Sequence, residues 1–208
     1  MRKSIILTAL MLIAAPVSAQ TTLGLKGGIG LATVSIEEAA VEEESLTRIV
    51  AGLELGVPVS DMFSVTLGGS YAQKGGGATV DDVGVTLEID YIQLSALAKL
   101  TTSPMGGGGV SVGAMAGPWI AYRLSCDVGV AAEGLSLSAP CEDRSLSDFD
   151  IKAFDYGLAF GGGIEVPLFG NLRLGLDALY SLGLGDVDEG DSKTRLLTVQ
   201  AGLVFPIG

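Results

Sequence analysis

The sequence predicts an all-β protein, namely an eight-stranded antiparallel up-and-down transmembrane β-barrel preceded by a cleavable signal peptide. Three observations carry this prediction: an export signal at the start, eight segments that alternate between apolar and small or polar residues, and an asymmetry between long and short loops. An alternating strand shows one face to each of two environments. Lipid requires the apolar face outside, so we predict a location in a bacterial outer membrane.

Residues 1–19 have the features of a signal peptide. Arg2 and Lys3 form a positive start, and the apolar stretch that follows is too short to span a bilayer as a stable helix. Ala19 ends a small-residue cleavage site, so residues 20–208 are expected to form the barrel domain. An uncleaved anchor helix is the alternative, and the short apolar stretch disfavours it.

Each strand is predicted from its own alternation. The eight segments are, in chain order, residues 22–33, 48–59, 63–74, 86–100, 110–124, 151–166, 172–184 and 197–205. The first four have apolar faces that include Leu23, Leu25 and Ile29; Ile49, Leu53 and Leu55; Phe63, Val65 and Leu67; and Ile92, Leu94 and Leu100. The last four have apolar faces that include Val110, Val112 and Ile120; Phe154, Tyr156 and Phe160; Leu174, Leu176 and Tyr180; and Leu197, Val199 and Phe205.

The opposite faces carry mainly Gly, Ser, Thr and a few charges. Glycine weakens an ordinary sheet, but small inward residues leave room where backbones crowd in a narrow barrel. The repeated inward glycines therefore predict tight closure.

The connections alternate in length and charge. Long, polar and acidic loops are expected at residues 35–46, 75–85, 125–150 and 185–193. Shorter turns with few charges are expected at residues 60–62, 101–109 and 167–171. Outer-membrane barrels have long external loops and short periplasmic turns, and an even number of strands brings both termini to one side. We therefore expect periplasmic N and C termini.

The charge of the chain limits the partners it can bind, and its two cysteines predict a disulfide. The chain has 12 Lys and Arg against 24 Asp and Glu, and loss of the signal would leave 10 against 24. Such acidity argues against nucleic acid, because phosphates would be repelled. Cys126 and Cys141 fall within one long loop of an exported chain, so a disulfide is expected, with two unpaired thiols as the alternative.

The chain has no histidine, which removes the commonest general base and a major metal ligand. Glu165 and Arg173 flank a tight turn and are placed to pair across a hairpin, and Asp177 or Asp155 could pair with Lys26 or Lys99 across the lumen. A structural charge network is preferred over catalysis. Its expected members are Lys26, Glu54, Lys99, Asp155, Glu165, Arg173 and Asp177.

No cofactor or metal is expected. Glycine runs at residues 106–109 and 161–163 lack the Lys-Ser/Thr and helix start of a phosphate loop. The acidic run at residues 186–191 misses the spacing and the distal Glu of a calcium-binding EF-hand loop, so a solvated loop is preferred there.

Several motifs occur in a consistent order along the mature chain. They are residues 71–75 (Tyr-Ala-Gln-Lys-Gly), 113–119 with their Gly-Pro-Trp ending, 155–157 (Asp-Tyr-Gly), 161–163 (Gly-Gly-Gly) and 180–184 (Tyr-Ser-Leu-Gly-Leu). Together they resemble the PorT-like family of small bacterial outer-membrane β-barrel proteins. The resemblance implies an outer-membrane barrel and no particular activity.

Eight strands enclose a lumen that side chains can fill. The expected function is therefore a non-enzymatic outer-membrane barrel with a filled lumen and acidic surface loops, in a structural or surface-interaction role. A narrow porin-like channel for small solutes or ions is one alternative, and a soluble ligand-carrying β-barrel is another. Expected partners are outer-membrane lipids, the outer-membrane assembly machinery and an unnamed extracellular partner, with the chain acting as a monomer.

Overall fold

The computed structural model describes residues 21–35, 43–44, 46–80, 83–102, 109–132, 135–141, 152–185 and 193–207. Within these ranges the chain is built from strands alone. The strands are β1 (Thr22–Ser35), β2 (Glu43–Glu44), β3 (Leu46–Pro58), β4 (Phe63–Val80), β5 (Val83–Thr101), β6 (Ser111–Ala132), β7 (Leu135–Pro140), β8 (Phe154–Pro167), β9 (Arg173–Gly183) and β10 (Lys193–Pro206). The predicted signal peptide lies outside the described residues.

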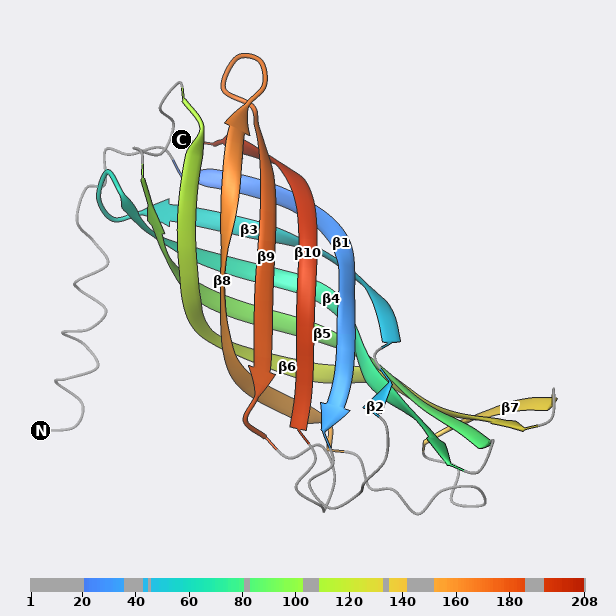
Figure 1. Ribbon diagram of the computed structural model, residues 1–208. Helices are drawn as coiled ribbons and strands as arrows, with labels where there is room; N and C mark the ends of the chain where they lie inside the picture. Colours follow the sequence, from blue (N-terminus) through green and yellow to red (C-terminus); the bar gives the residue numbers. More distant parts are fainter. Residues whose placement is uncertain are drawn as a thin grey trace, which may run out of the picture.

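Eight strands close into one antiparallel barrel (Figure 1). Neighbours in the sequence pair with each other around the wall, apart from β2 and β7, which are short additions to β4 and β6. β1 closes the ring, because Leu25 lies opposite Leu203 of β10 on one side and opposite Leu53 of β3 on the other. The predicted fold class, an eight-stranded up-and-down barrel, is confirmed.

Both ends of the described chain lie at the end of the barrel that carries the short turns. The Ile207 amide donates to the Thr21 carbonyl at 2.8 Å, which joins the two termini. In the β3–β4 turn, the Val59 amide donates to the Phe63 carbonyl at 2.8 Å. The β8–β9 turn contains Gly170 with φ of 58°, a left-handed conformation that favours glycine. We call this the short-turn end and the opposite one the loop end.

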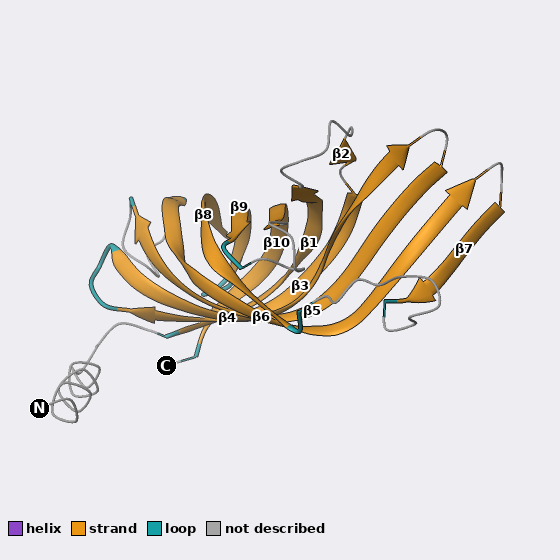
Figure 2. Ribbon diagram, turned by 90° about the horizontal axis from the view of Figure 1, so that it is seen from below, coloured by secondary structure: helices purple, strands orange, loops and turns teal. Residues whose placement is uncertain are grey.

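Two hairpins extend much further than the sequence predicted (Figure 2). β4 and β5 remain paired until Val80 meets Val83, so most of the predicted loop at residues 75–85 is strand. β6 continues to Ala132 and pairs with β7, which occupies part of the predicted loop at residues 125–150. Backbone pairing with a neighbour holds these Gly-, Val- and Ser-containing segments in strands, although their composition resembles that of a loop.

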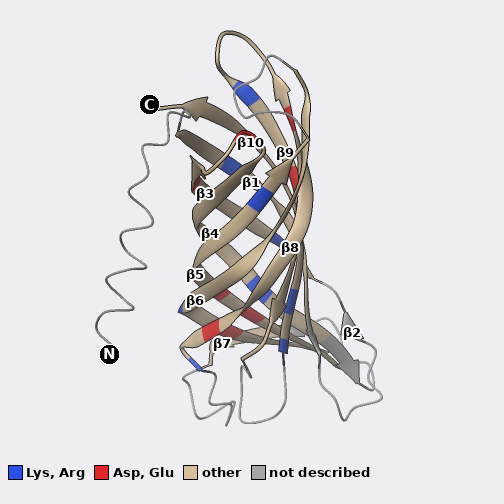
Figure 3. Cartoon of the chain, turned by 90° about the vertical axis from the view of Figure 1, so that its left-hand side faces the viewer, with Lys and Arg blue, Asp and Glu red and all other residues tan. Residues whose placement is uncertain are grey.

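The outer wall of the barrel is apolar. Exposed side chains come from every barrel strand and include Leu25, Ile49, Leu67, Leu94, Ile120, Phe160, Leu176 and Val199. Leu94 is 56% and Ile29 58% exposed, values that would be costly in water. The strands carry few Lys, Arg, Asp and Glu positions (Figure 3). The described part of the chain contains no helix long and apolar enough to cross a membrane.

The interior differs in one respect from the prediction of Gly, Ser, Thr and scattered charges. A buried apolar cluster extends from the middle of the barrel to the loop end. It consists of Ile89, Tyr91, Leu97, Met115, Trp119, Ala121, Cys126, Cys141 and Ala159. The prediction was wrong for this level because the inward positions of β5 and β6 carry large residues where other strands carry glycine.

Candidate functional site

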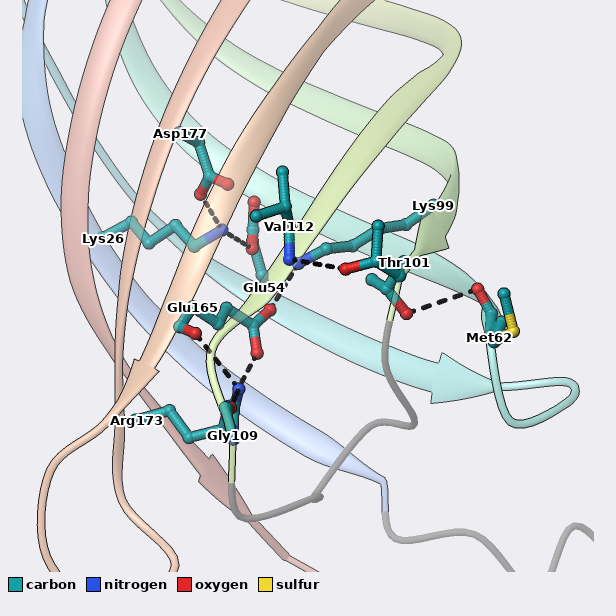
Figure 4. Close-up of polar contacts among 11 residues, drawn as sticks. Lys26, Glu54, Met62, Lys99, Thr101, Gly109, Val112, Glu165, Arg173 and Asp177 are labelled. Carbon is teal, nitrogen blue, oxygen red and sulfur yellow. Dashed lines mark hydrogen bonds and ion pairs between the residues drawn. The ribbon is translucent and has the colours of Figure 1, made fainter.

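Lys26 is held between two carboxylates in the short-turn half of the barrel (Figure 4). Its ammonium group pairs with Glu54 of β3 and with Asp177 of β9. The Lys26 side chain is only 5% exposed. Gly202 makes room for its stem, since a Cβ on Gly202 would lie 2.6 Å from Lys26 Cγ. A glycine on the neighbouring strand β10 thus makes room for a long cation that links β3 and β9 on the two sides of β1.

A second charge cluster lies beside the first. Lys99 of β5 pairs with Glu165 of β8, and the Arg173 guanidinium of β9 contacts the same carboxylate at 3.1 Å. Arg173 Nη2 also donates to the backbone carbonyls of Glu165, at 3.2 Å, and Gly109, at 3.0 Å. Glu165 therefore holds two cations from different strands, and the short β8–β9 turn positions one of them.

These clusters border a cavity at the short-turn end. It has a volume of about 190 Å³, and its lining includes Lys26, Glu54, Lys99, Glu165 and Arg173. A smaller cavity of about 50 Å³ lies further along the lumen and is lined mainly by Gly, Ser and aliphatic residues. Lys26 and Glu54 line both cavities. The Lys26–Glu54 ion pair therefore lies where the two spaces meet.

A buried cation lies in the loop-end half. Lys74 of β4 pairs with Asp155 of β8 at 3.1 Å, and the Thr194 hydroxyl donates to the same carboxylate oxygen at 2.8 Å. The Lys74 ammonium lies 3.6 Å from the ring centroid of Trp119 and 5.0 Å from that of Tyr91. This geometry matches a cation–π contact shielded from water. An ion pair and two aromatic rings thus fill one level of the lumen.

The structure places the predicted charge residues in three groups. Asp177 pairs with Lys26, one of the pairings that the sequence left open, and Glu165 and Arg173 meet across their hairpin. Asp155 pairs with neither Lys26 nor Lys99, because it lies nearer the loop end, beside Lys74.

Lys74, Tyr91 and Trp119 were absent from the predicted network. The alternation of their strands gave the only available indication, since all three occupy inward positions.

Cys126 and Cys141 form a disulfide with Cα atoms 5.4 Å apart. Both side chains belong to the apolar cluster, so the bond joins the base of β7 to the barrel core. Within the described residues, no group of three or more His, Cys, Asp or Glu is placed to hold a metal ion. The acidic run at residues 186–191 lies outside those residues.

These features define a class of protein: a closed β-barrel with an apolar outer wall and its charges inside, as required of a barrel that meets lipid. The chain belongs to the outer membrane protein beta-barrel domain family, whose family model matches residues 18–189. It is thus an outer-membrane protein.

One solved structure agrees in fold at low sequence identity, and two others are similar over most of their length. The outer membrane protein OprG from Pseudomonas aeruginosa is 10% identical, with a TM-score of 0.58, and the match covers 91% of this chain and 96% of OprG. Neisserial surface protein A is 13% identical, with a TM-score of 0.49 and coverage of 89% and 97%. Ail, the attachment invasion locus protein of Yersinia pestis, is 14% identical, with a TM-score of 0.47 and coverage of 89% and 99%. A comparison with curated protein sequences finds no match.

Proposed function

We propose that this chain is a non-enzymatic outer-membrane barrel whose interior is filled by side chains and whose loop end displays acidic loops in a structural or surface-interaction role. One observation supports the proposal: buried ion-paired side chains occupy the interior at two separate levels. The Lys26–Glu54 pair lies where the two cavities meet, and Lys74 with Trp119 occupies a level nearer the loop end.

Charge pairing supports a non-enzymatic role. Glu165 is neutralised by two cations, and Asp155 lies within a buried pair that also includes the Thr194 hydroxyl. A general acid or base needs contact with a substrate, whereas these carboxylates are paired with cations from other strands. With no histidine in the chain, structural closure accounts for the charges better than catalysis does.

We place the short-turn end in the periplasm, with both termini, and the loop end outside the cell. The short turns and the joined termini at one end support this orientation, as do the long connections at the other. Protease added to intact cells is expected to cut only within residues 35–46 and 125–150. Cleavage confined to the short turns would refute this orientation.

Planar-bilayer recording tests the filled lumen. The purified wild-type barrel is expected to show no stable conductance, and steady open channels would overturn the proposal. The combined variant Lys74→Ala and Trp119→Ala widens one level only, so it should remain closed while the Lys26–Glu54 pair is intact. Adding Glu54→Ala should then increase the frequency of openings, which shows that the assay detects an open lumen.

A narrow channel is the alternative, and an exchange of charges separates it from the filled barrel. The double variant Glu165→Arg with Arg173→Glu keeps an opposite-charge pair at the turn. In a conducting pore it would change ion selectivity. In a filled barrel it would change only resistance to heat, read as the temperature at which the folded band disappears in SDS gels.

The outward apolar wall disfavours the soluble ligand-carrying barrel, which needs its apolar face inside. Within the family, we assign the chain to the PorT-like group, supported by the motifs at residues 71–75 and 113–119. We further propose that it is a monomer that contacts outer-membrane lipids and the assembly machinery and does not bind nucleic acid.

A further inference from the structure

The extended hairpins form a small sheet beyond the loop end of the barrel. Its strands are the outer parts of β4, β5 and β6 together with β7, and they project away from the barrel wall (Figure 2). On the outer face of β4 and β5, Gln73 Nε2 donates to Asp90 at 3.1 Å, and the Ser125 hydroxyl of β6 donates to Asp90 at 2.8 Å. This polar row ends the apolar wall, so the sheet beyond it is placed outside the hydrocarbon.

One face of this sheet carries an apolar row. Val85 of β5 lies opposite Val130 of β6, which in turn lies opposite Leu137 of β7. These side chains are 39%, 42% and 64% exposed. An antiparallel sheet can leave one face in water, but that face is then normally polar. An aligned row of exposed aliphatic residues therefore marks an interaction surface.

A β-bulge creates the alignment. The β5–β6 register shifts between Asp90 and Tyr91, with Leu124 of β6 as the extra residue. Without this shift, Val85 would lie opposite Gly129 and not opposite Val130. Bulges redirect side chains in this way at the ends of barrels. The row continues inward through Leu87 and Val128, which pack against the buried cluster.

β7 offers an open edge to a partner strand. Among the described strands it pairs with β6 alone. The Cys141 amide donates to the Cys126 carbonyl at 2.9 Å, so the antiparallel alternation directs the amide and carbonyl groups of Ser136 and Ser138 away from β6. Pro140 fits the same alternation. Its backbone nitrogen points away from β6, so the N–H that proline lacks is not needed for a bond to β6. The disulfide fixes the base of β7, so the edge is held in place before any partner arrives.

We propose that the β7 edge and the row Val85–Val130–Leu137 bind an extended, basic polypeptide segment by strand addition. Backbone pairing with Ser136 and Ser138 would supply affinity, and an alternating aliphatic residue of the partner would extend the row beside Leu137. The opposite face of the sheet carries Glu88 and Asp127 side by side. Glu88 is paired with Arg48 at 3.0 Å, so the exposed carboxylate of Asp127 supplies the acidic group for a partner. Basic residues of the partner would lie on that side.

Charge also decides against a second copy of this chain as the occupant. The formal net charge of −12 makes two copies repel each other, whereas a cationic segment is attracted. The proposal rests on the proposed function only for its orientation, with the loop end outside. Its test does not depend on conductance, so either idea can fail while the other stands.

The experiment uses the full-length barrel, folded in lipid nanodiscs with its disulfide intact. The probe is a fluorescent extended peptide that alternates lysine and valine, and fluorescence anisotropy measures its Kd. Leu137→Ser removes the apolar contact and should raise the Kd about tenfold. Ser138→Pro removes the outward N–H without touching a β6 bond and should have a similar effect. Phe169→Ser, at an apolar residue in a short turn that is 76% exposed against 64% for Leu137, is the control and should leave the Kd unchanged.

Heat-modifiable gel mobility verifies that each variant is folded. The proposal is overturned if folded Leu137→Ser and Ser138→Pro bind the peptide as wild type does. It is also overturned if a peptide of the same composition with a central proline binds equally well, since charge alone would then explain binding. Sedimentation that shows a dimer dependent on Leu137 would assign the surface to a second copy and would likewise refute it.

Discussion

Replacing Lys74 by methionine isolates the buried ion pair of the loop-end half. Methionine keeps the length of the stem and removes the charge. Asp155, whose side chain is 0% exposed, then retains the hydroxyl of Thr194 but loses its cation. Breaking one side of a buried pair typically costs about 3–5 kcal/mol, because an uncompensated charge stays out of water. We expect a loss in that range for Lys74→Met.

The reciprocal change should cost less. In Asp155→Leu, Lys74 loses the carboxylate but keeps Trp119 at 3.6 Å and Tyr91 at 5.0 Å. A desolvated cation–π contact is worth about 2 kcal/mol, so the expected loss is about 1–3 kcal/mol. The double variant replaces the pair with apolar groups, an exchange that is often close to neutral. The double-mutant cycle of Lys74→Met and Asp155→Leu should therefore show a coupling energy of at least about 2 kcal/mol between the two positions.

The assay is urea unfolding of the barrel in detergent micelles, followed by tryptophan fluorescence. Trp119 is the only tryptophan in the chain, so the signal reports the level that is perturbed. Lys152→Met, at an exposed lysine just before β8, is the matched control and should stay within about 0.5 kcal/mol of wild type. Additive single losses with no coupling, or a loss for Lys74→Met no greater than that of the control, would refute the reasoning.

Three further predictions concern the wall, the disulfide and the outer face. A Cβ on Gly161 would collide with the Ala178 carbonyl, so Gly161→Ala should lower the unfolding free energy by about 1–3 kcal/mol in urea, whereas Gly109→Ala, with open space around it, should not. Reduction of Cys126–Cys141 should expose β7 to limited proteolysis while the barrel keeps its heat-modifiable mobility; unchanged β7 protection would contradict the anchoring role. Leu94→Arg places a charge against lipid and should cost about 2–4 kcal/mol if the residue lies near the bilayer midplane, measured by unfolding in liposomes.

The outer wall could be predicted from sequence because every strand must present apolar side chains to lipid. A residue such as Leu94 must be apolar wherever it stands along the strand, so the period of two is visible without knowledge of the partner strand. The presence of each strand, and which of its side chains point outward, followed from this alternation. The two protruding hairpins did not, because their strands persist through pairing and their outer residues face no lipid.

The contacts of the interior were harder to predict. They depend on how far along the barrel axis each residue lies, as well as on whether its side chain points inward. The alternation predicts that Lys74 and Asp155 point inward. The two residues are 81 positions apart in the chain, however, and they meet only because of the tilt and stagger of the strands in the closed barrel. Asp177, by contrast, was one of two carboxylates proposed for Lys26, and the closed barrel selects it. The bulge at Leu124 adds a shift of register that no alternation pattern on one strand can reveal.

The apolar layer and the ion pairs of the lumen depend on each other. A salt bridge open to water is weak and readily exchanged, whereas the same pair in a medium of low dielectric is strongly held. Leu97 and Ala159 line the inner cavity and also belong to the buried cluster that contains Trp119, so aliphatic side chains separate the Lys26 level from the Lys74 level. Water that enters the larger cavity meets the Lys26–Glu54 pair first and then this layer. The Lys74–Asp155 pair is therefore strong because the layer keeps it dry, and the layer holds its position because the pair and its aromatic neighbours link four consecutive strands of the wall, β4, β5, β6 and β8.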